Sequence, residues 1–345
     1  MKKALKVILL VIAIPALYVV GNLLYATLTD YQPAKETSIF VRNASTASAG
    51  DTVSVLIWNI GFTGLGKETD FFYDGGKVVT QEPEIVAKNR EGIKAFISNH
   101  QEVDFILFQE IDSVGKRSHG FNHLDEMHAI LPDHSSAFAM NYNVDFVPVP
   151  FFDPMGKVKS GIATFSKRNI AEAKRHGFDS QMDWPTRLYF LDRCFLATPT
   201  ETKSGKDLLV LNTHCSAYDT AGTMVANEVS DMMKVAREAY AKGAHVIAGG
   251  DWNQCPPNYT PINPNGNYGE FILQPDQLDE GWRWIADPST PTNRKLTTKY
   301  NEDSYTSVID HFFVSPNVEV IEVKTIDLNF EYSDHQPVLL KAKLN

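Results

Sequence analysis

The chain has 345 residues, enough for one large domain or two small ones, and its 43% hydrophobic residues are ordinary for a globular protein with a sizeable core. Its net charge of −10 gives no general attraction to nucleic acid or anionic lipid, which disfavours a non-specific nuclease but leaves room for a local basic groove. The three cysteines, Cys194, Cys215 and Cys255, have neither the pairing of a disulfide framework nor the spacing of a zinc site, and we interpret them as small buried thiols.

The N-terminal segment combines basic and apolar residues. Lys2, Lys3 and Lys6 precede an apolar run that ends near Leu28, a pattern typical of an export signal or a membrane span. No cysteine lies near the end of the run and no Ala-x-Ala cleavage site stands out, so we favour an uncleaved anchor over a cleaved signal for residues 1–29. With the basic end inside, we expect the remaining chain outside the cytoplasm, either anchored to the membrane or, after cleavage, secreted or periplasmic.

After a polar, Ser/Thr/Ala-rich stretch at 30–50 that we interpret as a linker, residues 51–345 are expected to form one catalytic domain. Short apolar runs predict strands, and helical spacing of apolar residues predicts helices. The expected strands cover 53–58, 104–109, 136–141, 161–166, 189–198, 207–213, 245–249, 306–315, 318–325 and 338–343, and the expected helices begin near Pro83 and cover 122–130 and 220–242. These elements fit two packed sheets with helices on the outside.

Polar residues stand at the ends of several expected strands. The six segments that carry them are 55–59, 105–110, 211–214, 249–253, 309–311 and 333–335, and most are apolar runs that end in Asn, Glu, His or Asp. A strand end holds its side chain rigidly, so several ends that converge form a preorganised site of oxygen ligands and imidazoles.

The ordered set of segments resembles the endonuclease/exonuclease/phosphatase superfamily, which includes pancreatic deoxyribonuclease, abasic-site endonucleases, neutral sphingomyelinases and inositol polyphosphate phosphatases. The resemblance rests on Trp58-Asn59, Gln109-Glu110, Asn212-Thr213-His214, Gly250-Asp251-Trp252-Asn253, Ile309-Asp310-His311 and Ser333-Asp334-His335. It implies a four-layer α/β/β/α sandwich of two packed mixed sheets, here preceded by a hydrophobic anchor helix.

The resemblance also implies a metal site. In it, Glu110 is the principal ligand of Mg²⁺, Asn59 helps to hold the metal or a phosphate oxygen, and Asp334 contacts the metal. Mg²⁺ needs few protein ligands because water and substrate phosphate complete its shell; Mn²⁺ and Ca²⁺ are alternatives. Some family members carry an acidic residue two positions after the Asn, where this chain has Gly61, so the choice between one and two metals stays open.

The catalytic residues are expected among the same segments. A buried Asp is costly unless paired, and a His needs a partner to fix its tautomer, so we predict that Asp310 orients a catalytic His335. By resemblance, His214 is a second catalytic imidazole beside the scissile phosphate. Asp251 and Asn253 are two residues apart and face the same way in an extended chain, so we expect them to align water and contact phosphate, with an Asx-type turn as the alternative.

Residues outside the segments are expected to bind substrate. Arg193 has the donor fork that suits a phosphate, with an ion pair to Asp192 as the alternative. Asn141 and Tyr142 fall where relatives supply a phosphate-contacting Tyr. The other histidines lack a motif, and we expect them at the surface; they include His100, His119, His123, His128 and His134.

The leading functional hypothesis is a Mg²⁺-dependent hydrolase of phosphate esters, more often diesters than monoesters, that works by in-line attack of water. Aromatic clusters in the expected loops 71–73 and 147–152 favour a lipid-like or small-molecule substrate on a membrane-tethered protein. The alternatives are an exported endo- or exonuclease, for which nucleic acid is the partner, and a non-catalytic binding module on the same fold. No protein partner can be inferred.

Overall fold

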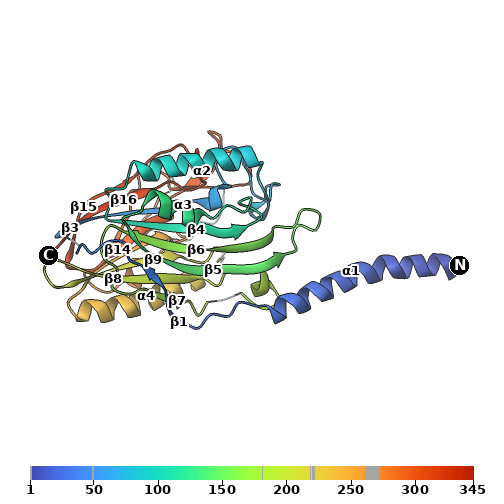
Figure 1. Ribbon diagram of the computed structural model, residues 1–345, viewed down its shortest axis with the longest axis horizontal. Helices are drawn as coiled ribbons and strands as arrows, with labels where there is room; N and C mark the ends of the chain where they lie inside the picture. The colour runs from blue at the N-terminus through green and yellow to red at the C-terminus, as the bar shows by residue number, and fades with distance from the viewer. Residues whose placement is uncertain (1, 49, 181, 218, 220–221, 261–271) are drawn as a thin grey trace.

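The computed structural model describes residues 2–345 apart from 49, 181, 218, 220–221 and 261–271. In the described part of the chain, two seven-stranded sheets pack against each other. Helices α2 (Pro83–Ser98) and α3 (His123–Ile130) cover the outer face of one sheet, and α4 (Thr223–Ala241) covers the outer face of the other (Figure 1). Helix α1 (Lys2–Leu28) projects away from this body.

The sheet under α2 and α3 has the strand order β15-β16-β3-β4-β6-β5-β2. Its strands are β2 (Val41–Arg42), β3 (Thr52–Asn59), β4 (Phe105–Gly115), β5 (Ser135–Val147), β6 (Gly156–Ser166), β15 (Val318–Thr325) and β16 (Val338–Leu344). Because β3 and β4 are parallel and the other neighbours are antiparallel, the sheet is mixed.

The sheet under α4 has the order β1-β7-β8-β9-β10-β14-β11, and only β9 and β10 are parallel among its described strands. Its strands are β1 (Glu36–Ser38), β7 (Lys174–Gly177), β8 (Cys194–Glu201), β9 (Asp207–His214), β10 (His245–Asp251), β11 (Arg283–Ile285) and β14 (Asp310–Val314). Small elements complete the fold: a ribbon of β12 (Asn293–Arg294) and β13 (Thr306–Ser307), and the 3₁₀ helices η1 (Gly61–Thr63), η2 (Phe72–Asp74), η3 (Thr186–Tyr189) and η4 (Pro275–Gln277).

The side chains of β3 show why the central strands are apolar throughout. Val55 and Ile57 pack with Leu208 of the other sheet in the core between the sheets. Their neighbours Leu56 and Trp58 point the opposite way and pack in the core under α2 and α3. A strand that is buried on both faces needs a continuous apolar run, and this sandwich confirms the predicted α/β/β/α fold.

The helices match their predicted starts where these are described. Pro83 is the first residue of α2, where its missing N–H costs nothing. Asn122 caps α3, and its side chain accepts a hydrogen bond from the backbone N–H of Asp125. Thr220, where we expected the third helix to begin, lies outside the described residues; α4 begins at Thr223.

Several expected strands have different bounds. Within 189–198, a 3₁₀ turn after Pro185 ends at Tyr189, and strand β8 begins only at Cys194. The expected strand 306–315 is divided into β13 and β14, because β13 pairs with β12 whereas β14 pairs with β10 and β11. Pairing partners decide these bounds, and a single apolar run does not show them.

The segment 30–50, expected to be a linker, contains two short strands. Strand β1 pairs with β7 at the edge of one sheet, and β2 pairs with β5 at the edge of the other. Just before them, Asp30 lies 3.6 Å from the guanidinium of Arg187 in η3. Edge strands need no apolar run, which is why the polar composition of this segment concealed them.

Candidate active site

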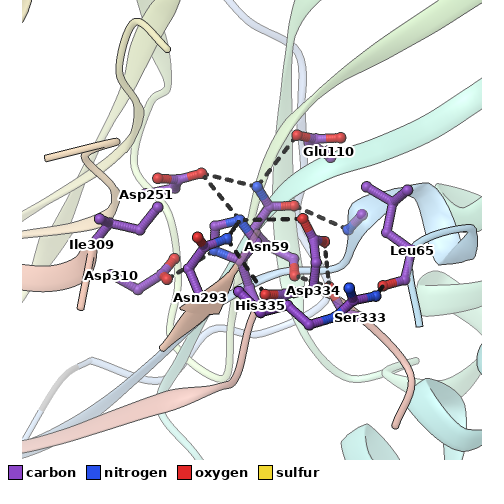
Figure 2. A network of polar contacts seen from close by, with 12 residues as sticks. Asn59, Leu65, Glu110, Asp251, Asn293, Ile309, Asp310, Ser333, Asp334 and His335 are labelled. Atoms are coloured by element: carbon purple, nitrogen blue, oxygen red, sulfur yellow. Dashed lines mark hydrogen bonds and ion pairs between the residues drawn. The ribbon is translucent and has the colours of Figure 1, made fainter. Parts of the chain in front are cut away.

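The polar residues singled out in the sequence meet at one edge of the sandwich. Parallel pairing aligns the ends of β3 and β4 in one sheet and the ends of β9 and β10 in the other. Antiparallel β14 begins opposite the end of β10. Strand β16 begins opposite the end of β3, so the loop that precedes β16 lies at the same edge. This topology brings together Asn59, Glu110, Asp251, Asp310, Asp334 and His335 (Figure 2). His214 lies beside them and lines the same pocket.

Two buried amides join the sheets directly beneath the site. Gln109 Nε2 donates to Asn212 Oδ1 at 2.8 Å, and Asn212 Nδ2 donates to the carbonyls of Phe108 and Ala163. Gln109 and Asn212 immediately precede Glu110 and Thr213, so the bonds fix the relative height of β4 and β9. Gln109 and Asn212 therefore fix the positions of the two sheets relative to each other at the site.

Glu110 lies at a bulge inside β4, which corrects our expectation that it ends its strand. Its φ is +52°, and the register of β4 with β6 shifts between Phe108 and Ile111. A bulge redirects a side chain while the strand continues. Glu110 is thereby turned toward Asn59, whose Nδ2 lies 3.4 Å from Glu110 Oε1 and donates to Asp251 Oδ2 at 3.0 Å (Figure 2).

Asp310 and His335 form the expected pair. His335 Nδ1 lies 2.8 Å from Asp310 Oδ2, and both side chains are buried. The other ring nitrogen, Nε2, faces the site, 3.7 Å from Asp251 Oδ2 and 3.8 Å from Asp334 Oδ2. Burial opposes the charged imidazole, but the surrounding carboxylates outweigh it and raise the pKa of His335 well above its usual value.

His214 experiences the opposite electrostatic effect. Its Nε2 lies 3.5 Å from Asp251 Oδ2 and 4.0 Å from Glu110 Oε1. Burial, reinforced by the positive charges of Arg193 and His335, lowers the pKa of His214 well below its usual value. The site thus holds one imidazole that favours the charged form and one that favours the neutral form.

Asp251 and Asn253 form the Asx-type turn that the sequence left as the alternative to an extended pair, and both line the pocket. Asn253 has φ +53°, and its backbone N–H donates to Asp251 Oδ1 at 2.9 Å in an Asx-type turn. The Asn253 side chain donates to the carbonyl of Cys215. Asp251 Oδ2 is left at the centre of the site, between Asn59, His214 and His335.

Two glycines leave room that a larger residue would fill. A Cβ at Gly61, which has φ +48°, would lie 2.8 Å from Asp334 Oδ1. A Cβ at Gly250 would lie 2.0 Å from the carbonyl oxygen of Thr213 on the neighbouring strand. The first glycine gives Asp334 its position, and the second allows β9 and β10 to approach at the site.

Arg117 is a site residue that the sequence did not reveal. It donates to both oxygens of Asp112, its guanidinium carbon lies 3.9 Å from the ring centroid of Phe62, and its Nη1 is 3.9 Å from Glu110 Oε2. This buried fixed cation therefore stands behind Glu110. The only sequence signal is its position seven residues after Glu110, in a polar segment without an apolar run.

Asn293 was also missed. Its Nδ2 lies 3.0 Å from His335 Nε2, so the amide contacts the ring nitrogen that faces the site (Figure 2). Asn293 belongs to the two-residue strand β12, whose length gives no strand signal. The neighbouring Arg294 is buried and donates to the carbonyls of Leu65, Gly66 and Thr69, which ties the loop after η1 to the site.

The three residues predicted to bind substrate all line the same pocket. Arg193 does not depend on Asp192; its Nη1 donates to the carbonyl of Cys215 at 2.5 Å. The hydroxyl of Tyr142 donates to the carbonyl of Tyr189 at 2.9 Å. Asn141 is buried, and its Nδ2 has no hydrogen-bond partner among the described residues, so this amide is the one poised for a ligand.

The expectation that the remaining histidines lie at the surface is wrong for several of them. His123, His134 and His245 are buried, and His123 Nε2 lies 3.2 Å from Thr63 Oγ1. Burial lowers the pKa of His123 to about 4. His123 is the first residue of α3, and the side of a short helix that faces the core cannot be read from eight residues.

The site opens into a pocket of about 550 Å³. Its polar side carries the carboxylates, imidazoles and amides of the site, with Arg117, Arg193, Arg294 and Lys295 as cations. Its other side is aromatic and apolar, and consists of Leu65, Phe71, Tyr73, Tyr142, Met155, Tyr189, Phe190, Leu191, Leu296 and Tyr305. The pocket suits a ligand with an anionic group and an apolar or aromatic portion.

The donor set fits a divalent cation. Burial raises the pKa of Glu110, and it raises the pKa of Asp334 to about 7, because these carboxylates share a dry site with too little positive charge. One ligand atom each from Asp251, Asp310 and His335 lies within 4.8 Å of the others. Since Asp310 is already committed to His335, the oxygens of Glu110, Asp251 and Asp334 are the better ligands for a hard cation.

A family model described as the endonuclease/exonuclease/phosphatase family matches residues 56–335. The chain belongs to this family. Its members are typically phosphoester hydrolases and commonly depend on a divalent metal. The matched range contains all six polar segments that the sequence singled out, apart from Val55 at the start of the first. The predicted resemblance is therefore confirmed.

Solved structures share the fold. An endonuclease/exonuclease/phosphatase from Beutenbergia cavernae is 17% identical with a TM-score of 0.55, covering 85% of this chain and 72% of its own. TDP2 from D. rerio, complexed with single strand DNA product, is 12% identical with a TM-score of 0.55, covering 85% and 99%. The catalytic domain of human Nocturnin, with bound sulfate, is 15% identical with a TM-score of 0.53, covering 89% and 98%. Comparison with curated proteins gives no match.

Proposed function

We propose that this protein is a Mg²⁺-dependent phosphodiesterase that cleaves its substrate by in-line attack of water. The observation that carries the proposal is the arrangement around Asp251 Oδ2. This oxygen accepts a hydrogen bond from Asn59 Nδ2 at 3.0 Å. It also lies 3.5 Å from Nε2 of His214, which favours the neutral form, and 3.7 Å from Nε2 of His335, which favours the charged form. These groups supply the acceptor and the cationic donor that displacement at phosphorus needs.

Glu110, Asp251 and Asp334 are the proposed metal ligands, with Asn59 contributing its amide oxygen after a rotation of the side chain. When bound, the metal neutralises charge on a phosphate oxygen. Arg117 Nη1 lies 3.9 Å from Glu110 Oε2. Its positive charge opposes the rise in the pKa of Glu110 and fixes the direction of the carboxylate. Mn²⁺ is the natural substitute in such a donor set, and Ca²⁺ fits less well because it requires more oxygens.

The proposed chemistry uses the other side chains directly. Asp251 accepts the proton of the attacking water, while charged His335, held by Asp310, donates its Nε2 proton to the leaving oxygen. The bond from phosphorus to the leaving oxygen breaks as the new bond forms. Neutral His214 and the Asn141 amide contact the remaining phosphate oxygens, and Arg193 holds the loop after His214 through the carbonyl of Cys215.

The aromatic side of the pocket favours a diester over a monoester. A diester has a second substituent that can lie on Tyr73, Tyr189 and Tyr142, whereas a monoester leaves this surface in water. Nucleic acid is the second candidate substrate, since one structural neighbour is a TDP2 complexed with single strand DNA product. Both candidates require the same metal and imidazoles.

The test is hydrolysis of bis-p-nitrophenyl phosphate and p-nitrophenyl phosphate by the full chain with Mg²⁺, with EDTA, and with Mg²⁺ restored. We expect diester cleavage that EDTA abolishes and Mg²⁺ recovers. Glu110→Gln should lower the rate by about 100-fold or more, whereas Glu102→Gln, whose side chain is 93% exposed, should leave it unchanged. Equal rates for wild type and Glu110→Gln, together with no effect of EDTA, would falsify the assignment.

A further inference from the structure

An exposed aromatic tip lies next to the apolar helix α1. In the loop between β5 and β6, Phe152 is 96% exposed, Phe151 is 59% exposed and Val149 is 46% exposed. This loop points to the same side of the domain as α1 does (Figure 1). We call residues 149–152 the aromatic tip. Exposed aromatic residues that gather in this way mark a binding surface.

The aromatic tip is joined to α1 by specific contacts. The rings of Tyr18 and Phe151 meet edge to face with centroids 5.4 Å apart. Seven residues further along α1, Tyr25 Oη lies 3.5 Å from Asp145 of β5. Helix α1 also contacts η3, which is preceded by Trp184, a side chain that is 57% exposed. The tip and helix therefore form one continuous apolar surface.

The length of α1 places the tip within a bilayer that the helix crosses. Helix α1 is long and apolar enough to span a membrane. A hydrocarbon core of about 30 Å needs about 20 helical residues at roughly 1.5 Å each. From Lys6 to Tyr18 the helix advances only about 18 Å. The core must therefore continue past Tyr18, so Phe151 lies at the level of the core or its interface.

The aromatic tip adjoins the candidate active site without lining its pocket. Tyr73, which lines the pocket, donates its hydroxyl to the carbonyl of Val149 at 2.5 Å. Met155, in the same loop, lines the pocket as well, and so does Tyr189 of η3. The elements that contact α1 are thus the rim of the pocket on its aromatic side.

From these contacts we propose that the aromatic tip inserts into the outer leaflet of the membrane that α1 spans, and that the pocket takes its phosphodiester from lipid headgroups of that leaflet. The second part rests on the proposed function. Lys116 and Lys157 pair with Asp153 and Asp145 beside the tip, so charged groups flank the apolar side chains that would insert. Insertion of aromatic side chains to this depth is favourable at the boundary of headgroups and acyl chains.

The insertion is tested without reference to catalysis. Full-length Phe152→Cys protein is reconstituted in vesicles of phosphatidylcholine and phosphatidylglycerol and labelled with an environment-sensitive thiol dye; the native cysteines Cys194, Cys215 and Cys255 are buried. We expect blue-shifted emission and quenching by lipids that carry a spin label on the upper acyl chain. Ile321→Cys, a 55% exposed site on β15, is the matched control and should respond only to aqueous iodide.

The proposal is overturned if the label at residue 152 responds like the control. It is also overturned if that label is shielded from both quenchers, because a protein would then cover the tip. These results do not depend on activity, so they stand even if the phosphodiesterase proposal fails.

The substrate is tested with the same vesicles. Phe152→Ser should lower hydrolysis of lipid headgroups by roughly tenfold, the partition change for a side chain of this size, and Ile321→Ser should not. Neither variant should change the rate on bis-p-nitrophenyl phosphate or on glycerophosphocholine, which lacks acyl chains. Faster cleavage of glycerophosphocholine or DNA than of vesicle lipid would overturn the lipid substrate, whereas no cleavage of any diester would overturn the proposed function itself.

Discussion

Gln109 donates a hydrogen bond to Asn212 at 2.8 Å across the interface between the two sheets, directly beneath the candidate metal site. Every polar atom of the Asn212 side chain is used, because its Nδ2 also donates to the carbonyls of Phe108 and Ala163. The site depends on residues from both sheets, so this contact sets how far apart its two halves lie.

We therefore expect Asn212→Leu to lower the free energy of unfolding by about 2–4 kcal/mol, because it removes three buried hydrogen bonds, to Gln109 and to the carbonyls of Phe108 and Ala163. Phosphodiesterase activity should fall by more than the loss of folded protein explains, because β4 and β9 shift relative to each other in the folded variant. Thr198→Val removes a single buried hydrogen bond to the carbonyl of Val210 and should cost about 1 kcal/mol. Urea denaturation of both variants measures the loss of unfolding free energy in each. Equal losses would contradict a special role for Asn212 in joining the two sheets.

The Asp310–His335 contact at 2.8 Å predicts non-additive kinetics. Asp310→Asn and His335→Ala should each lower kcat by about 100-fold or more, because the first removes the partner that orients the imidazole and the second removes the imidazole. The double variant should be little worse than the worse single variant. Full additivity in a double-mutant cycle would show that the two side chains act independently.

The space at Gly61 predicts a metal-binding defect. In Gly61→Ala the Cβ would lie 2.8 Å from Asp334 Oδ1, at a backbone φ of +48° that L-residues disfavour. We expect a loss of about 1–2 kcal/mol in stability and a weaker Mg²⁺ affinity by isothermal titration calorimetry. Gly205→Ala is the matched control, since Gly205 has φ +79° and nothing within 4 Å of its added Cβ. That variant should lose stability but bind Mg²⁺ normally.

The buried His123 predicts destabilisation in acid. Burial lowers its pKa to about 4 in the folded protein, against roughly 6.5 in the unfolded chain. The unfolded state therefore binds more protons, and the stability present above pH 6.5 is lost as the pH falls toward 4. Between pH 7 and pH 5 this loss is about 2 kcal/mol.

The measurement for His123 compares unfolding free energies of the full chain in detergent at the two pH values. His123→Gln should be less stable than wild type at pH 7, and the gap should narrow by about 2 kcal/mol at pH 5. His119→Gln changes an exposed histidine and should leave the pH dependence unchanged. A gap that stays constant for His123→Gln would mean that another group controls acid unfolding.

Residues that end apolar runs could be predicted from the sequence. Asn59, His214 and Asp251 follow strands that are buried on both faces, so composition alone marks where each strand meets the site. The bulge at Glu110 could not be predicted in this way. It depends on how β4 pairs with β6, and that pairing is a property of two distant segments.

Residues held by loops were missed for a related reason. Arg117 and Asn293 stand in short polar segments, and only the folded chain shows that they approach Glu110 and His335. The turn at Asn253 was foreseen only as an alternative, because sequence spacing does not show whether a residue takes the left-handed conformation that Asn253 adopts. Local pattern thus identified the strand ends, while the contacts between strand ends and loops needed the tertiary structure.

The two edge strands β1 and β2 change what the N-terminal segment can do. A free linker of this length would let a catalytic domain move over a wide area. Here, however, β1 pairs with the edge of one sheet and β2 pairs with the edge of the other. Only residues 29–35 therefore lie between α1 and the first strand of the domain, so the pocket can move little relative to α1. If α1 spans a membrane as proposed, the pocket reaches only substrate that diffuses laterally to it, and lengthening the segment before β1 would extend its reach.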